Sequence, residues 1–201
     1  MTHPELLIGT ANRGKVTEIK RVLKDLPLKL LVVTDFPSLQ PPVEDGSSYA
    51  ENAIIKARSY AEQTGLLTLA DDSGLEVFAL NGLPGLRSAR FGGEGLSDAD
   101  RTSLLLSKLL KVDEELRAAS FICAMAIAKP NGEVINVSHG TCPGNIARAP
   151  CGEQGFGYDP VFIPAGYDMT FAEMRLPSKN TISHRGQALA ATREFLERFC
   201  V

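Results

Sequence analysis

The apolar residues of this chain change their pattern midway, and that change constrains the fold more than any other feature. Apolar runs at residues 5–10, 28–33 and 66–70 predict buried strands with helices between them. Further along, residues 119–129 and 133–139 flank the sequence PNGE, which is a strong hairpin signal. Strands that alternate with helices, followed by a hairpin, predict a mixed α/β sheet rather than a purely doubly wound one.

Apolar stripes and capping residues predict four helices. Residues 15–26 carry one apolar stripe, formed by Val16, Ile19, Val22, Leu23 and Leu26. Ser48 and Glu51 form a capping-box pattern for a second helix that ends near Gly65. Ser97 caps a third helix, which carries Leu104, Leu105, Leu109 and Leu110. The last helix begins near Gly186 and faces inward with Ala188, Leu189, Phe195, Leu196 and Phe199, after a strand near residues 160–163.

Length and composition predict one domain over residues 1–201. The 201 residues are 44% hydrophobic and contain no repeat or long linker, so they can bury a full core. With 21 Lys and Arg against 24 Asp and Glu, no broad nucleic-acid-binding face is expected. No secretory signal is evident, and no apolar run approaches the roughly 20 residues of a membrane span. We therefore expect a cytoplasmic protein that binds neither nucleic acid nor membranes.

The four cysteines do not form a metal-binding pattern. Cys123, Cys142, Cys151 and Cys200 include no C-x-x-C pair, and the chain has only three histidines to join them. A zinc site is not expected, and reduced thiols are the default for such a chain.

The segment GTANRGKV resembles a phosphate-binding loop between a strand and a helix. Gly9, Gly14 and Lys15 have the required spacing, and backbone N–H groups at a helix start can hold phosphate. However, Val16 stands where such a loop needs Ser or Thr to bind Mg²⁺. The segment is therefore either an ordinary strand–helix turn, which is about as common, or a phosphate site whose metal is held elsewhere.

Acidic side chains after the third strand offer a place for that metal. Asp71 and Asp72 are expected at the carboxyl end of this strand, where α/β sheets bind ligands. Glu44, in the loop before the second helix, could add an oxygen, and Mg²⁺ prefers carboxylates and phosphate oxygens. Taken alone, the sequence Asp-Asp-Ser-Gly is more often a hydrophilic turn.

Two segments near the C-terminus are suited to a nucleotide. SKNTISHRG supplies Lys179, His184 and Arg185, which can contact phosphate or a base edge, although Ser183 as a simple helix cap fits equally well. GFGYD, residues 155–159, offers aromatic rings, glycines and an acid, or else a plain Gly-rich turn. Lys56, Arg87 and Arg90 face either a ligand or solvent.

Six motifs together make the chain resemble a known family. TANRGK, ENAIIKA, LADDSGL, GLPGLRSARFGG, GFGYDPVF and SKNTISHRGQAL occur in the order found in the inosine/xanthosine triphosphate pyrophosphatase family (Ham1/RdgB-like). The motifs cover the chain from Thr10 to Leu189. Departures are small: Phe91 stands where Tyr is frequent, and CGEQ precedes the GFGYD run.

The resemblance implies a fold and an activity. The fold would be an elongated mixed α/β sheet flanked by helices, with two lobes around an active-site cleft, usually in a homodimer. The activity would be Mg²⁺-dependent hydrolysis of ITP, dITP and XTP between the α and β phosphates, giving monophosphate and pyrophosphate. Such an enzyme removes deaminated purines from the nucleotide pool.

The resemblance also implies a role for each matched residue. Asp72 would be the catalytic proton acceptor and would hold Mg²⁺ together with Glu44. Lys56 and Ser73 would contact substrate. The triphosphate would be held by Thr10, Ala11, Asn12, Arg13, Gly14 and Lys15. The nucleotide, chiefly its base, would be recognised by Phe156, Gly157, Tyr158, Asp159, Lys179, His184 and Arg185.

Three other readings of the sequence compete with this one. A pyrophosphatase for modified pyrimidine nucleotides on a similar fold is less consistent with SHRG and GFGYDP. A nucleotide-binding module without turnover would not need Lys15, Glu44, Asp72 and His184 together. A phosphate-loop NTPase is disfavoured by Val16.

Overall fold

The computed structural model describes residues 3–199 and divides the chain into two compact units. Unit 1 contains the residues up to Asp72, Cys123–Gly140 and the residues from Arg185 onward. Unit 2 contains Ser73–Ile122 and Thr141–His184. Each unit has its own apolar core, and each holds a different part of the predicted site.

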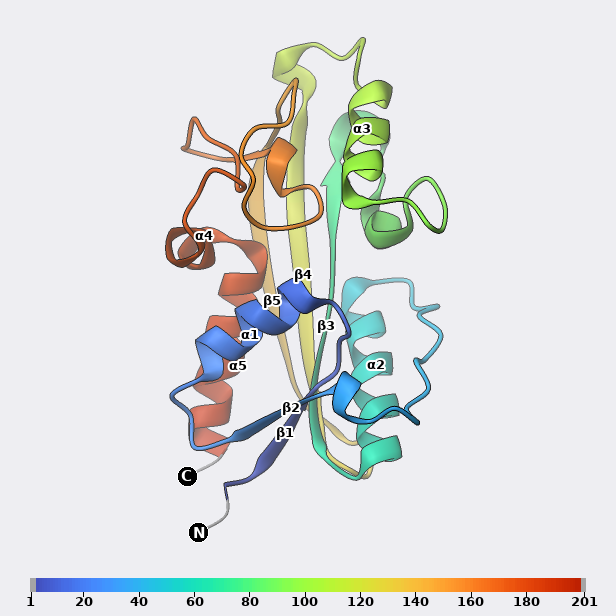
Figure 1. Cartoon of the computed structure of the whole chain (residues 1–201), viewed down its shortest axis with the longest axis vertical. Coiled ribbons are helices and arrows are strands. Elements are labelled where there is room, and N and C mark those ends of the chain that lie inside the picture. Colours follow the sequence, from blue (N-terminus) through green and yellow to red (C-terminus); the bar gives the residue numbers. More distant parts are fainter. Residues whose placement is uncertain (1–2, 200–201) are drawn as a thin grey trace. The chain divides into compact units, whose positions relative to one another are not determined.

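A six-stranded mixed sheet runs through the chain in the order β2-β1-β3-β4-β5-β6 (Figure 1). Its strands are β1 (Glu5–Ile8), β2 (Lys29–Val32), β3 (Leu67–Val77), β4 (Ala118–Ala128), β5 (Val134–Ile146) and β6 (Phe162–Pro164). β1 pairs in parallel with β2 and β3, whereas β5 pairs antiparallel with β6. The predicted mixed α/β fold is therefore confirmed, and so is the hairpin, whose turn is closed between Lys129 and Glu133.

Five α-helices lie within residues 3–199. They are α1 (Arg13–Leu23), α2 (Tyr49–Thr64), α3 (Asp98–Lys108), α4 (Leu176–Ile182) and α5 (His184–Phe199). The Ser48 side chain caps α2 and Gly65 ends it in a left-handed conformation, as predicted. The Glu51 carboxylate also accepts from the Ser47 N–H and hydroxyl, each at 2.7 Å. Helix α4 was not predicted, because seven residues containing Pro177 present no helical apolar period.

The core of unit 1 lies on both faces of the sheet. Leu6 and Ile8 of β1 point to the face covered by α1 and α5, while Leu7 between them points to the face covered by α2. Figure 1 shows α2 on one side of β3 and α1 with α5 on the other. This alternation follows from the two-residue period of a strand, and it assigns each side chain of β3 to one helix layer.

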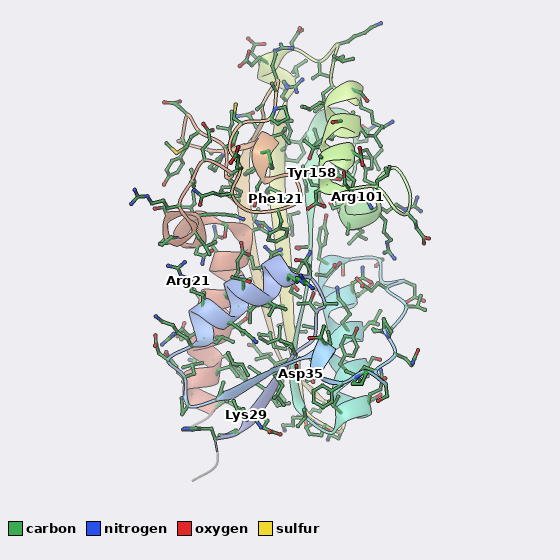
Figure 2. The ribbon with its side chains drawn as sticks, viewed as in Figure 1. Arg21, Lys29, Asp35, Arg101, Phe121 and Tyr158 are labelled. Carbon is green, nitrogen blue, oxygen red and sulfur yellow. The ribbon has the colours of Figure 1, made fainter. Side chains whose placement is uncertain are left out.

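The core of unit 2 packs residues 73–77 of β3 against α3, β6 and the segments around them. Leu75 and Val77 pack with Leu105 and with a cluster of aromatic rings. In that cluster the Phe121 and Phe162 ring centroids lie 4.6 Å apart, edge to face. Figure 2 labels Phe121 and Tyr158 within this unit. Helix α3 begins as predicted, with Ser97 and Asp100 forming a capping box.

Three sequence expectations are wrong. β3 does not end at Ala70 but continues to Val77, so Asp71 and Asp72 lie inside a strand rather than in a turn after it. Leu110 follows the end of α3 and is exposed, and Phe199 is likewise half-exposed instead of facing inward.

Among residues 3–199, no helix is long and apolar enough to cross a membrane.

Candidate active site

The loop before α1 forms the start of a helix whose first turn carries no acid. Asn12 caps the helix, because its side chain accepts from the Lys15 N–H at 3.1 Å. Thr10 in turn accepts from the Asn12 N–H at 3.2 Å, which fixes the approach to the helix. Ala11, Asn12 and Arg13 are exposed, so the positive end of the α1 dipole is accessible to an anion.

Asp71 forms a buried ion cluster on the α1 and α5 side of β3. Its carboxylate is fully buried, and its Oδ2 lies 2.9 Å from Lys15 Nζ and 3.5 Å from Arg185 Nε. The Arg185 guanidinium also lies 2.7 Å from Glu18 Oε2 through its second nitrogen. Two acids and two bases therefore balance in charge within this cluster.

The cluster keeps Asp71 ionised. Burial alone would raise the pKa of this carboxyl, but the positive charges of Lys15, Arg185 and Lys56 outweigh burial and lower the pKa to about 2. A group that keeps its charge at all ordinary pH values cannot act as a base near neutrality. Asp71 is thus an anchor for Lys15 and Arg185.

Acid is expected to destabilise the fold through Asp71. Because the folded pKa of about 2 lies below the ordinary 3.8, the stabilisation by Asp71 is present above about pH 4 and is lost as the pH falls through 2. The shift corresponds to about 2 kcal/mol. Urea unfolding of the wild type and of Asp71→Asn between pH 5 and 2 measures this, and the variant should lack that part of the pH dependence. Equal pH dependence in the two proteins would contradict the assignment.

Asp72 forms a second cluster, on the α2 side of β3. Lys56 Nζ lies 3.3 Å from Asp72 Oδ1 and 2.8 Å from Glu44 Oε2. Asn52 Nδ2 donates to Asp72 Oδ2 at 3.2 Å. Burial raises the pKa of the Asp72 carboxyl, although the charges of Lys56 and Lys15 lower it in part. Asp72 is therefore more easily protonated than a free aspartate, unlike its neighbour.

Asn52 also places the loop that carries Glu44. Its Oδ1 accepts from the Gly46 N–H at 2.8 Å. A Cβ added at Gly46 would lie 2.7 Å from Asn52 Oδ1 and 2.8 Å from Glu51 Cβ, so only glycine permits this approach. One α2 side chain thus holds both the carboxylate of Asp72 and the loop of Glu44. Sequence reasoning did not select Asn52, although its spacing of four from Lys56 places both on one helix face.

The donor set around Lys56 fits a hard divalent cation. Glu44 and Asp72 direct carboxylate oxygens at one positive charge, and Mg²⁺ favours such oxygens. Within the described part of the chain, no group of three or more His, Cys, Asp or Glu side chains forms a metal site. A metal held here would therefore take two protein carboxylates and fill its other positions with water or phosphate.

In unit 2, the segment GFGYD is held from several sides. The Asp159 carboxylate accepts from the Phe156 N–H at 2.9 Å and lies 2.6 Å from Lys179 Nζ. Gly155 has φ +79°, and a Cβ there would meet the Asp159 carboxylate, so a glycine is required. Lys179 Nζ also lies 5.2 Å from the centroid of the Phe156 ring and 5.5 Å from that of Phe171.

Tyr158 and His184 are both buried in unit 2. The Tyr158 hydroxyl donates to the Ser88 carbonyl at 3.0 Å, and the ring belongs to the core. The backbone N–H of Tyr158 has no acceptor among residues 3–199. The His184 ring stacks on Phe121, with centroids 4.5 Å apart and an angle of 6°.

The predicted site residues therefore fall into separate groups. Thr10 to Lys15, Glu44, Lys56, Asp72 and Arg185 belong to unit 1, and Ser73, Phe156 to Asp159, Lys179 and His184 belong to unit 2. Arg87 and Arg90 lie on the surface of unit 2. Glu18, the partner of Arg185, gave no signal in the sequence, because its position next to Ile19 reads as solvent-facing.

Among the described residues, the cysteines do not form a second reactive site. Cys123 and Cys142 are buried and Cys151 is exposed, and all three are free thiols, while Cys200 lies outside the described residues. Burial, together with the charge of Asp71, raises the pKa of the Cys123 thiol to about 12, so it is not a thiolate.

The chain is similar to several known proteins over nearly its full length. A family model described as the Ham1 family matches residues 6–195. A protein named dITP/XTP pyrophosphatase from Desulforamulus reducens is 47% identical over 98% of both chains. A second protein of that name, from Corynebacterium efficiens, is 44% identical over 93% of this chain and 94% of its own. The structure of a HAM1 protein from Coxiella burnetii covers 97% of this chain and 99% of its own, with 42% identity and a TM-score of 0.88.

Proposed function

The chain belongs to the Ham1 family, and from that membership and the geometry of Asp72 we propose that it hydrolyses non-standard purine nucleoside triphosphates. The substrates would be ITP, dITP and XTP. The bond cleaved would join the α and β phosphates, and the products would be a nucleoside monophosphate and pyrophosphate. The observation that carries the proposal is the convergence of Glu44 and Asp72 on one positive charge beside a helix start that can hold phosphate.

Glu44 and Asp72 would hold Mg²⁺, which when bound would neutralise charge on the triphosphate. The proposed phosphate contacts come from Lys15, Lys56 and the N–H groups at the start of α1. Lys15 is held for this role, because its Nζ already lies 2.9 Å from the ionised Asp71.

Asp72 would accept the proton of the attacking water. As the water oxygen bonds to phosphorus, the bond to the α–β bridging oxygen breaks and pyrophosphate leaves. The raised pKa of Asp72 supports this choice over Asp71, whose pKa is lowered to about 2. The hydrogen bond from Asn52 orients the Asp72 carboxylate for the transfer.

The segment GFGYD, with Lys179 and His184, would recognise the purine base. Hypoxanthine and xanthine carry an oxygen at position 6, whereas adenine carries an amino group there. Hydrogen-bond donors such as Lys179 Nζ and the Tyr158 N–H suit the oxygen and leave adenine mismatched. A site built for such hydrogen bonds can discriminate by roughly 10⁴-fold or more.

Product analysis tests this proposal. Purified protein is incubated with Mg²⁺ and dITP, XTP, dATP or dGTP, and products are followed by phosphorus NMR and chromatography. Monophosphate and pyrophosphate from dITP and XTP are expected, with dATP and dGTP largely spared. Diphosphate and orthophosphate would overturn the proposed bond, and turnover only of pyrimidine nucleotides would overturn the substrate class. Omitting Mg²⁺ should abolish the reaction.

A homodimer, which the family resemblance implies, and a cytoplasmic location, which is the expectation from the sequence, form part of the same proposal. Sedimentation equilibrium at several protein concentrations measures the first of these, and a monomer throughout would contradict it.

A further inference from the structure

The GFGYD segment is held by helix α3 as well as by its own acid. Asp98, in the first turn of α3, accepts from the Gly157 N–H at 2.7 Å. Thr102, one helical turn further on, donates its hydroxyl to the Gly157 carbonyl at 3.4 Å. Because residues four apart lie on the same helix face, a single face of α3 holds both peptide groups of Gly157.

Helix α3 is itself fixed where it makes these contacts. The Ser97 and Asp100 capping box closes its first turn. Arg101, buried beside Thr102, donates to the carbonyls of Phe91 and Gly93 at 2.7 and 2.9 Å. Figure 2 labels Arg101 on this helix and Tyr158 of the segment. The helix is therefore a rigid support for Gly157.

The contact made by Asp98 determines how the segment presents its backbone. The Phe156 N–H is used by Asp159, and the Asp159 N–H donates to the Phe156 carbonyl. With Asp98 accepting from Gly157, the Tyr158 N–H is left without an acceptor among residues 3–199. Gly157 has φ +63°, and a Cβ added there would meet no atom within 4 Å, so no side-chain packing holds this residue.

We propose that Asp98 is a positioning residue for base selectivity. By holding the Gly157 N–H, it orients the next peptide so that the Tyr158 N–H faces the ligand together with the Phe156 ring. The inference rests on the proposed function, because it assumes that this segment recognises the base. Asp98 itself is exposed and contributes to selectivity only through Gly157.

The test compares two exposed aspartates of unit 2, Asp98 and Asp168. Asp98→Ala removes the acceptor of Gly157, whereas Asp168→Ala removes an equal charge from another exposed position. Asp98→Ala is expected to lower the ratio of kcat/KM for dITP over dATP by about tenfold, the size of one lost positioning hydrogen bond. Asp168→Ala should keep the wild-type ratio, and Asp98→Asn, which still offers an oxygen, should restore it.

Amide hydrogen exchange provides a second readout that needs no substrate. The Gly157 amide should exchange faster in Asp98→Ala than in Asp168→Ala or the wild type. If the wild type discriminates dITP from dATP and Asp98→Ala keeps that ratio, the inference is overturned while the proposed function stands. If the wild type itself turns over neither nucleotide, the proposed function fails and the inference fails with it.

Discussion

Asp72→Asn is expected to hydrolyse dITP roughly 10²–10⁴-fold more slowly than the wild type, the range expected when a general base is lost. The variant should still bind nucleotide. The amide keeps the size of the carboxylate but cannot take a proton. It also removes one of the two negative charges that converge on Lys56. The measurement is single-turnover hydrolysis of dITP with Mg²⁺, together with calorimetric binding of the monophosphate product.

The neighbourhood of Glu44 offers a matched control for this variant. Asp45→Asn makes the same chemical change at an exposed position one residue away from the proposed metal ligand. Its rate should stay within about twofold of the wild type, as expected for a surface substitution. If Asp72→Asn retains wild-type turnover, another group takes the proton. If both binding and turnover vanish, Asp72 acts in binding rather than in proton transfer.

Arg185→Met is expected to lower the free energy of unfolding by roughly 3–5 kcal/mol, because it removes a buried counter-charge shared by two buried carboxylates. The side chains of Glu18 and Asp71 are almost fully buried, and Arg185 lies between them. Methionine fills part of the volume but supplies neither charge nor hydrogen bonds. Urea unfolding at neutral pH measures the loss.

Arg198 on the same helix is the matched control for this stability loss. Its guanidinium lies 3.8 Å from the Glu194 carboxylate, and the side chains of Arg198 and Glu194 are 72% and 70% exposed. Arg198→Met should therefore change stability by no more than about 0.5 kcal/mol. The double variant Glu18→Gln with Arg185→Met should lose less than the two single changes added together, because they share one contact. A loss for Arg185→Met no larger than that of the control would contradict the buried-cluster interpretation.

The periodicity of apolar residues predicted most of the helices and strands, whereas buried charges made one strand end hard to predict. The apolar stripe of α1, the cap of α2 and the PNGE hairpin are local signals, and each appears where the sequence indicates. The predicted third strand ends at Ala70, which is too early, because Asp-Asp-Ser-Gly has the composition of a turn. The strand continues because Lys15, Arg185 and Lys56, all distant in sequence, supply the charges that make buried carboxylates tolerable.

Only those residues of the candidate site that belong to a recognisable sequence pattern could be predicted. Glu44, Lys56 and Asp72 were selected from the sequence, and the structure brings these three together. Asn52 and Glu18 were missed, because a polar residue on a helix reveals its partner only once the helix is placed. The assignment of individual roles to Ser73, His184 and the other substrate residues stays a prediction.

The position of Asp71 and Asp72 inside a strand has a consequence for how the site can change. In β3 successive side chains point to opposite faces, so the anchor Asp71 and the proposed base Asp72 contact different partners although they are adjacent in sequence. Inserting or deleting one residue before them would shift the register and turn each carboxylate to the opposite face. An insertion would put Asp71 in the place of Asp72, and a deletion would put Asp72 in the place of Asp71. Variation in length should therefore be tolerated in the loops of this chain and not in the strand that carries its chemistry.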